Sequence, residues 1–97
     1  MSRPEKLSAE VIDNRLGDLP GWTRSDNAIM ALFPFKDFSE AWAFMSRCAL
    51  AAEKLDHHPD WSNVYNCVTV KLNTHDQGGI TELDLQLAEM MNSYYRK

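Results

Sequence analysis

The amino-acid sequence predicts an α+β fold of two layers, a four-stranded antiparallel sheet with three helices packed on one face. Segments whose apolar residues recur every three or four positions alternate with segments where they recur every second position. These segments follow one another in the order α-β-β-α-β-β-α, and strands joined by short turns are typical of antiparallel hairpins. The chain of 97 residues is long enough for one modest core, so we expect residues 1–97 to form a single domain.

The first helix is predicted over residues 8–18, where Ser8 is a suitable N-cap. Two glycines and a proline between positions 17 and 21 end it. Its apolar side consists of Val11, Ile12, Leu16 and Leu19.

A β-hairpin is predicted over residues 22–33. Its turn lies at residues 25–27, where Asp26 and Asn27 are suited to left-handed backbone positions. In the second strand, apolar side chains occur on both faces, with Ile29, Ala31 and Phe33 on one and Met30 and Leu32 on the other. We therefore expect this strand to be covered on both sides.

The second helix is predicted from about residue 38 to residue 56. Asp37 and Glu40 have the spacing of an N-cap and a reciprocal acidic partner. One continuous apolar stripe is predicted to face the core, formed by Phe38, Trp42, Met45, Ala49, Ala52 and Leu55.

The second pair of strands is predicted between residues 61 and 74, where valines and leucine alternate with polar residues. Extending the alternation puts His75 on the polar face, together with Lys71 and Asn73. A loop over residues 74–79 leads to a third helix at roughly 81–95, for which Thr81 and Asp84 have capping-box spacing. The apolar stripe of this helix is predicted to be Leu83, Leu87, Met90 and Tyr94.

The composition of the chain argues against several classes of function. The net charge is −4 and no basic cluster offsets it, which argues against a nucleic-acid surface. No apolar run approaches the roughly 20 residues that cross a bilayer, and no hydrophobic segment follows the N-terminal residues, so we expect neither a membrane span nor a secretory signal. Cys48 and Cys67 lie in apolar segments, which favours buried, reduced thiols in a cytoplasmic protein.

The stretch from residue 53 to residue 61 is the candidate site. His57 and His58 stand side by side where the helix must end, because Pro59 pushes the residue before it toward extended geometry. Histidine can give or take a proton near neutral pH, as general acid–base catalysis requires. Glu53 lies one turn before His57 and is expected to converge with it, and Asp56 flanks the pair. Adjacent side chains on an extended backbone point to opposite sides, so the two histidines cannot hold equivalent positions around a ligand.

Plainer interpretations exist for these residues. The two histidines before a proline are compatible with a surface turn, and a metal site is less expected because they lack zinc-type spacing and no cysteine pair is present. A capping role at the start of the third helix is enough to explain Asp84. Trp22 is suited to the core, or to covering a flat ligand.

Together these residues resemble the pterin-4a-carbinolamine dehydratase family. The family pattern has an acidic or similar residue, a histidine followed by histidine or asparagine before proline, an aromatic residue, a further histidine and an aspartate at fixed spacings. This chain keeps every spacing with Glu53, His57, His58, Pro59, Tyr65, His75 and Asp84. The resemblance extends to Gly21-Trp22 and to residues 35–38.

The resemblance implies a cofactor-free enzyme that dehydrates 4a-hydroxytetrahydrobiopterin, or a related pterin, to the quinonoid dihydropterin and so recycles the cofactor of aromatic amino acid hydroxylases. It implies three catalytic histidines, with His57 and His75 as the acid–base pair and His58 holding the substrate. Asp56 and Asp84 are expected to support the site. Substrate contacts are implied for Trp22, Glu53, Pro59, Thr74, Asp76 and Gln77. Gln77 stands where coactivator members from animals tend to carry cysteine.

The family resemblance further implies a cytoplasmic homodimer or homotetramer with a pterin substrate, no direct nucleic-acid contact and no membrane contact. The alternative function is a non-catalytic dimerisation or transcription-coactivator module, since animal members stabilise a homeodomain transcription factor through a helix surface. A third interpretation is a member that has lost its pterin activity or acts in molybdopterin-related chemistry.

Overall fold

The computed structural model describes residues 4–95 of the chain. Residues 1–3, part of the segment considered for a secretory signal, and residues 96–97 lie outside the described residues. The elements are α1 (Ala9–Leu16), β1 (Thr23–Ser25), β2 (Ala28–Pro34), α2 (Phe38–Leu55), β3 (Asp60–Val64), β4 (Cys67–Leu72), the short 3₁₀ helix η1 (His75–Gln77) and α3 (Glu82–Tyr95).

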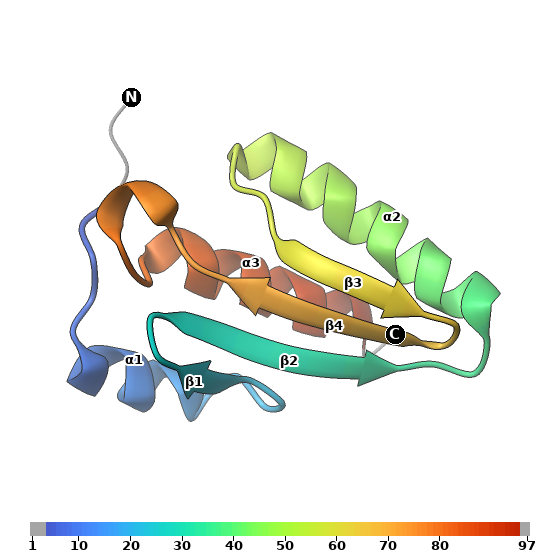
Figure 1. Ribbon diagram of the computed structural model, residues 1–97, viewed down its shortest axis with the longest axis horizontal. Coiled ribbons are helices and arrows are strands. Elements are labelled where there is room, and N and C mark those ends of the chain that lie inside the picture. The colour runs from blue at the N-terminus through green and yellow to red at the C-terminus, as the bar shows by residue number, and fades with distance from the viewer. Residues whose placement is uncertain (1–3, 96–97) are drawn as a thin grey trace.

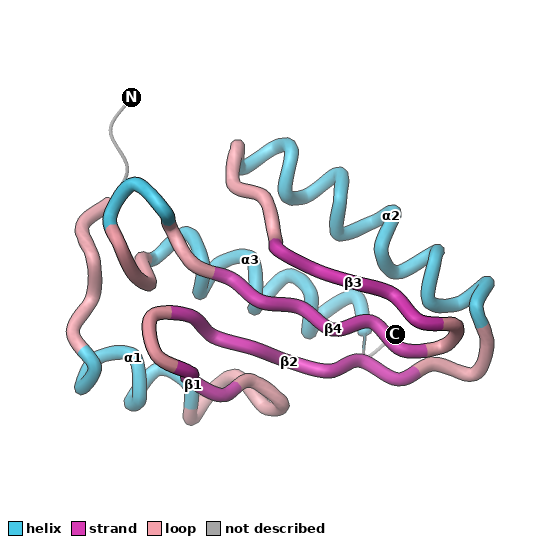
Figure 2. The backbone as a smooth tube through the Cα atoms, in the orientation of Figure 1, coloured by secondary structure: helices cyan, strands magenta, loops and turns pink. Residues whose placement is uncertain are grey.

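The four strands form one antiparallel sheet in the order β1-β2-β4-β3 (Figure 1). The helices form a second layer on one face of this sheet, where α2 and α3 pack against each other and α1 contacts β1. The tube drawing shows the two hairpins lying side by side, with α2 connecting them (Figure 2). The predicted fold class and element order are therefore confirmed.

The core lies between the sheet and the helices. On the covered face, β2 and β4 pair Ile29 with Leu72, Ala31 with Val70 and Phe33 with Val68, and all six side chains are buried. A strand places every second side chain on the same face, so this register puts the apolar sets of both strands into one layer.

The opposite face of the sheet is open, which corrects the prediction that β2 is covered on both sides. Leu32 is 60% exposed and Met30 is half-buried. All three helices lie on the other face, so the apolar residues that point away from them have no layer from the described chain above them. Period-2 alternation cannot show whether the second apolar face is covered by the same chain.

The turns and caps follow the sequence in most details. The side chains of Ser8 and Asp37 accept hydrogen bonds from the backbone N–H groups three residues later, as predicted. Glu40, however, accepts from the backbone N–H of Lys36 rather than completing a reciprocal pair with Asp37. Asp26 adopts the predicted left-handed conformation with φ of 56°, whereas the left-handed prediction for Asn27 was wrong.

The apolar stripes predicted for the helices were partly wrong. In α2 the predicted stripe residues Phe38, Trp42 and Ala49 are exposed, and in α1 Val11 is exposed. The buried face of α2 consists of Ala41, Phe44, Met45, Cys48, Ala51 and Ala52. In α3, Leu87 is buried as predicted, but Leu83, Met90 and Tyr94 are half-buried, and the core is filled by Leu85, Leu87, Ala88 and Met91.

Candidate active site

The end of α2 directs the two adjacent histidines to different environments. The helix stops at Leu55, and Asp56 takes a left-handed C-cap conformation with φ of 54°. The chain then turns back, and the backbone N–H of His57 donates to the carbonyl of Ala52 over 3.0 Å. As a result His57 is 6% exposed and faces inward, whereas the side chain of His58 is 56% exposed.

His57 is paired with a buried carboxylate. Its Nε2 atom lies 2.5 Å from Oδ1 of Asp84, which is fully buried in the first turn of α3. A charge-assisted hydrogen bond of this kind is strong where water is excluded. The contact engages Nε2 of the imidazole ring, so Nδ1 is the ring nitrogen that it leaves unoccupied.

The second oxygen of Asp84 completes the cap of α3. Oδ2 accepts from the backbone N–H of Thr81 over 2.9 Å, and Oγ1 of Thr81 accepts from the backbone N–H of Leu83 rather than from that of Asp84. Oδ2 also accepts from the hydroxyl of Thr74 over 2.9 Å. One carboxylate therefore caps α3 and contacts His57 at the same time.

Glu53 pairs with His58 and not with His57. Its Oε1 atom lies 2.8 Å from Nε2 of His58, which corrects the expected convergence of Glu53 with His57. Side chains four residues apart meet only while the helix continues, and α2 ends before His57 at the left-handed Asp56. Both partners are more than half exposed, and such an ion pair contributes about 0–1 kcal/mol to stability.

A cavity of about 200 Å³ brings the three histidines together. His57 and His58 come from the end of α2, and His75 comes from η1, after β4. The full lining is His57, His58, Asn73, Thr74, His75 and Asp76. Asn73 was not named as a site residue from the sequence, although its place on the same strand face as His75 was the signal that could have identified it.

Other expected site residues lie elsewhere within this chain. Trp22 is buried in the core, where its indole N–H donates to Oδ1 of Asn92 over 2.9 Å and its ring meets Phe33 edge-on. Trp22, Pro59, Gln77 and Asp56 are not among the residues that line the histidine cavity. Gln77 ends η1 and Pro59 follows His58, so both stay close to the cavity along the chain.

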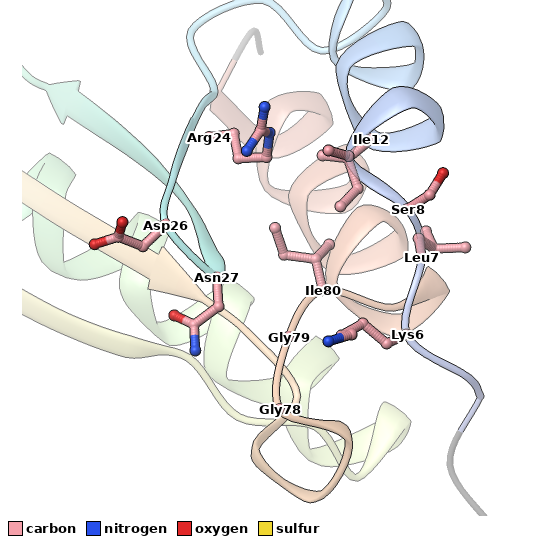
Figure 3. A pocket seen from close by; sticks show the side chains of 11 residues that line it. Lys6, Leu7, Ser8, Ile12, Arg24, Asp26, Asn27, Gly78, Gly79 and Ile80 are labelled. Carbon is pink, nitrogen blue, oxygen red and sulfur yellow. The ribbon is translucent and has the colours of Figure 1, made fainter.

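A second cavity, of about 270 Å³, lies between the segment before α1, the β1–β2 turn and the loop before α3 (Figure 3). It is lined by the side chains of Lys6, Arg24 and Asp26, among others, and by Gly78 and Gly79. Arg24 is already engaged in two hydrogen bonds with Asp13. No histidine lines this cavity.

Three further findings concern residues 4–95. No group of three or more histidine, cysteine or acidic side chains is arranged to hold a metal ion within that range. None of the helices there combines the length and apolar character needed to span a membrane. Both cysteines are free, with Cys48 buried and Cys67 half-buried rather than fully buried as expected.

Comparison with known proteins finds relatives that match nearly the whole chain. Residues 5–94 match the family model described as pterin 4 alpha carbinolamine dehydratase. Relatives from Mesorhizobium japonicum (56% identical, covering 94% of this chain and 95% of the relative) and Sinorhizobium fredii (53%, covering 93% and 88%) are each named "putative pterin-4-alpha-carbinolamine dehydratase". A crystal structure of a "transcriptional coactivator/pterin dehydratase" from Brucella melitensis is 47% identical, has a TM-score of 0.92 and covers 94% of this chain and 99% of its own.

Proposed function

Because the chain belongs to the pterin-4a-carbinolamine dehydratase family, we propose that it removes water from a 4a-hydroxytetrahydropterin, such as 4a-hydroxytetrahydrobiopterin. The product is the quinonoid dihydropterin, and the reaction returns an oxidised pterin to the cycle that serves aromatic amino acid hydroxylases. The observation that carries the proposal is the meeting of His57, His58 and His75 at one cavity.

The reaction requires two proton transfers. The bond between C4a and the hydroxyl oxygen breaks as an acid protonates that oxygen, and water leaves. The lone pair of N5 forms the new C4a–N5 double bond, and a base removes the proton from N5. Each positioned acid or base contributes roughly 10²–10⁴-fold to the rate of such a step.

We assign the two proton transfers to His57 and His75. The two residues reach the cavity from different elements, which suits groups that act on different atoms of one flat ring. Asp84 holds the His57 ring, so that Nδ1 is the atom that exchanges a proton with the substrate. His75 is exposed and lies on η1, where it can exchange its proton with solvent between turnovers.

The remaining site residues are assigned to binding. His58, held by Glu53, is proposed to contact the substrate from the exposed side of the cavity. Thr74 and Asp76 line the cavity directly, and Pro59 and Gln77 are proposed to contact the pterin from the adjoining chain. Trp22 and Asp56 do not line the cavity, so their proposed roles are to support the fold around it.

The proposal is tested by following the decay of a freshly prepared 4a-hydroxytetrahydropterin with purified protein. We expect His57→Ala and His75→Ala each to lower kcat by roughly 10²–10⁴-fold, because each removes one proton-transfer group. His57→Ala also leaves a buried carboxylate oxygen without its partner, which costs about 1–3 kcal/mol. The exposed His75→Ala is therefore the variant whose folding is least affected, and circular dichroism provides the check.

His58→Ala is the matched control, because it removes an exposed imidazole from the same cavity. We expect it to raise KM and to change kcat less than the other two substitutions do. Wild-type rates in both His57→Ala and His75→Ala would contradict the acid–base assignment. A wild-type protein without activity would favour the non-catalytic coactivator module instead.

We further propose that the protein works as a cytoplasmic homodimer or homotetramer. The outward face of α2 supports this proposal, since Phe38, Trp42 and Leu50 are 49%, 57% and 74% exposed. Large apolar side chains gathered on one surface are typical of interaction sites. The cytoplasm keeps thiols reduced, in agreement with two free cysteines.

A further inference from the structure

The carboxylate of Asp84 lies at the end of a chain of buried hydroxyl groups. Thr74 Oγ1 donates to Asp84 Oδ2 over 2.9 Å, and Thr81 Oγ1 lies 2.8 Å from Thr74 Oγ1. A hydroxyl group has one hydrogen to donate. Because Thr74 uses its hydrogen on Asp84, Thr81 must be the donor between the two hydroxyls, and the hydrogen bonds run in one direction, from Thr81 through Thr74 to Asp84.

Two donors and one histidine ring nitrogen surround the carboxylate of Asp84. Oδ2 accepts from the Thr74 hydroxyl and from the backbone N–H of Thr81, and Oδ1 faces Nε2 of His57. An ionised carboxylate offers only acceptors, so a ring nitrogen at hydrogen-bond distance from it has to be the donor. Nε2 of His57 therefore carries a hydrogen in both protonation states of the ring, and the proton exchanged with a bound molecule is the one on Nδ1.

We propose that Thr74 and Thr81 are positioning residues for the dehydration reaction. Their hydroxyls occupy Oδ2 of Asp84 and so hold Oδ1 against His57, which keeps the imidazole in the single tautomer that presents Nδ1 to the cavity. This inference rests on the proposed function, and it changes the role of Thr74: its hydroxyl acts through Asp84 and not through a contact with the substrate.

The effect of these hydroxyls can be separated from the placement of His75. The loop that carries His75 is held by backbone hydrogen bonds, with Thr74 N donating to Gly79 O over 2.7 Å and Gln77 N donating to Thr74 O over 3.0 Å. Valine has nearly the shape of threonine and the same branching at Cβ. Thr74→Val therefore removes the hydroxyl while the backbone that places His75 keeps its bonds.

A merely structural role and a positioning role predict that the loss of kcat is largest in different variants. Thr81→Val removes the cap to Leu83 N–H as well as the hydroxyl chain, but the Thr81 backbone N–H still serves Asp84. Thr74→Val removes a donor to Asp84 itself. Positioning therefore predicts the larger loss of kcat in Thr74→Val, whereas a structural role predicts at least as large a loss in Thr81→Val.

The experiment measures kcat and KM for Thr74→Val, Thr74→Ser, Thr81→Val and the control Thr69→Val, together with long-range ¹H–¹⁵N spectra of the His57 ring. Thr69 lies on β4 and faces the open side of the sheet, so its hydroxyl is not part of the chain. Partners that orient metal-binding histidines are worth roughly 10–100-fold, and we expect Thr74→Val to lower kcat by that factor with KM little changed. The Nε2 hydrogen of His57 is expected to exchange with water faster in this variant, and Thr74→Ser is expected to restore both properties.

Wild-type kcat and wild-type exchange in Thr74→Val would overturn the inference, as would a loss that Thr74→Ser does not restore or that Thr69→Val shares. The spectra need no turnover, so they distinguish this inference from the proposed function. If the wild-type protein has no dehydratase activity, the proposed function fails. In that case, a His57 hydrogen that exchanges faster in Thr74→Val than in the wild type would still support the positioning role.

Discussion

The side chain of Asp84 divides its two oxygens between a helix and a histidine. Oδ2 accepts from the Thr81 N–H at the start of α3, and Oδ1 faces Nε2 of His57. The first turn of a helix carries partial positive charge, which stabilises a carboxylate placed there. The beginning of α3 and the orientation of His57 therefore depend on the same negative charge.

Asp84→Asn tests this dependence with little change in volume. The two donors at Oδ2 will hold the amide oxygen, so the amide NH₂ group is left facing His57. An NH₂ group there requires Nε2 of His57 to accept, which moves the ring hydrogen to Nδ1. An aspartate-to-asparagine change that imposes the wrong tautomer in a serine protease lowers kcat about 10⁴-fold, and we expect a loss of about 10²–10⁴-fold here.

Steady-state kinetics and the tautomer seen by ¹⁵N NMR check the Asp84→Asn prediction, with urea unfolding as the control for stability. We expect the cap of α3 to survive, because the amide oxygen still accepts from Thr81. Activity close to wild type in a variant with the altered tautomer would show that Nδ1 of His57 is not the atom that exchanges a proton with the substrate.

The sequence predicted which histidines lie together better than it predicted their hydrogen-bond partners. All three histidines of the predicted site meet at one cavity, but Glu53 contacts His58 instead of His57. The pairing depends on the exact residue at which α2 ends, and a single left-handed residue, Asp56, turns the next side chain inward. Helix ends are the least certain part of a pattern-based prediction, so contacts across them are the first to be lost.

At the scale of elements, the order and type of the helices and strands could be predicted because their apolar periods differ. The buried face of α2 could not, because apolar residues surround much of the helix. Phe38 and Trp42 follow the three- and four-residue spacing as well as Ala41 and Cys48 do, yet only the second pair is buried. Periodicity identifies an apolar stripe but does not say which of two stripes meets the sheet.

Cys48 gives the buried face of α2 a measurable pH dependence. Burial raises the pKa of its thiol from the ordinary value of 9.0 to about 12. The unfolded chain therefore releases this proton first, and the thiol's contribution to stability is lost as pH rises above about 9. Each pH unit in that window corresponds to about 1.4 kcal/mol.

Comparison of the wild type with Cys48→Ala by urea unfolding isolates this contribution from other titrating groups. Between about pH 8 and about pH 10.5 we expect the wild type to lose about 2 kcal/mol more unfolding free energy than the variant does. Equal losses in the two proteins would show that the thiol ionises in the folded state as easily as in the unfolded state.

At the scale of the whole molecule, residues 4–95 leave apolar side chains exposed on the sheet and on α2. Leu32 is exposed on the open face of the sheet, and Trp42 and Leu50 are exposed on α2. An apolar residue gives the same sequence signal whether its partner lies in its own chain or in another. For this reason both faces of β2 were predicted to be covered, although the chain itself covers only one of them.

The outward face of α2 provides the test of the proposed self-association. Burying a leucine-sized side chain contributes about 1.5–3 kcal/mol, so Trp42→Lys and Leu50→Lys are each expected to weaken assembly by roughly 10–100-fold. Light scattering after size-exclusion chromatography should give a dimer or tetramer for the wild type and a smaller species for these variants. Val11→Lys is the control, because Val11 is 43% exposed on α1, away from α2. A monomeric wild type, or variants that keep the wild-type mass, would contradict assembly through α2 and leave the open sheet face as the remaining apolar surface to examine.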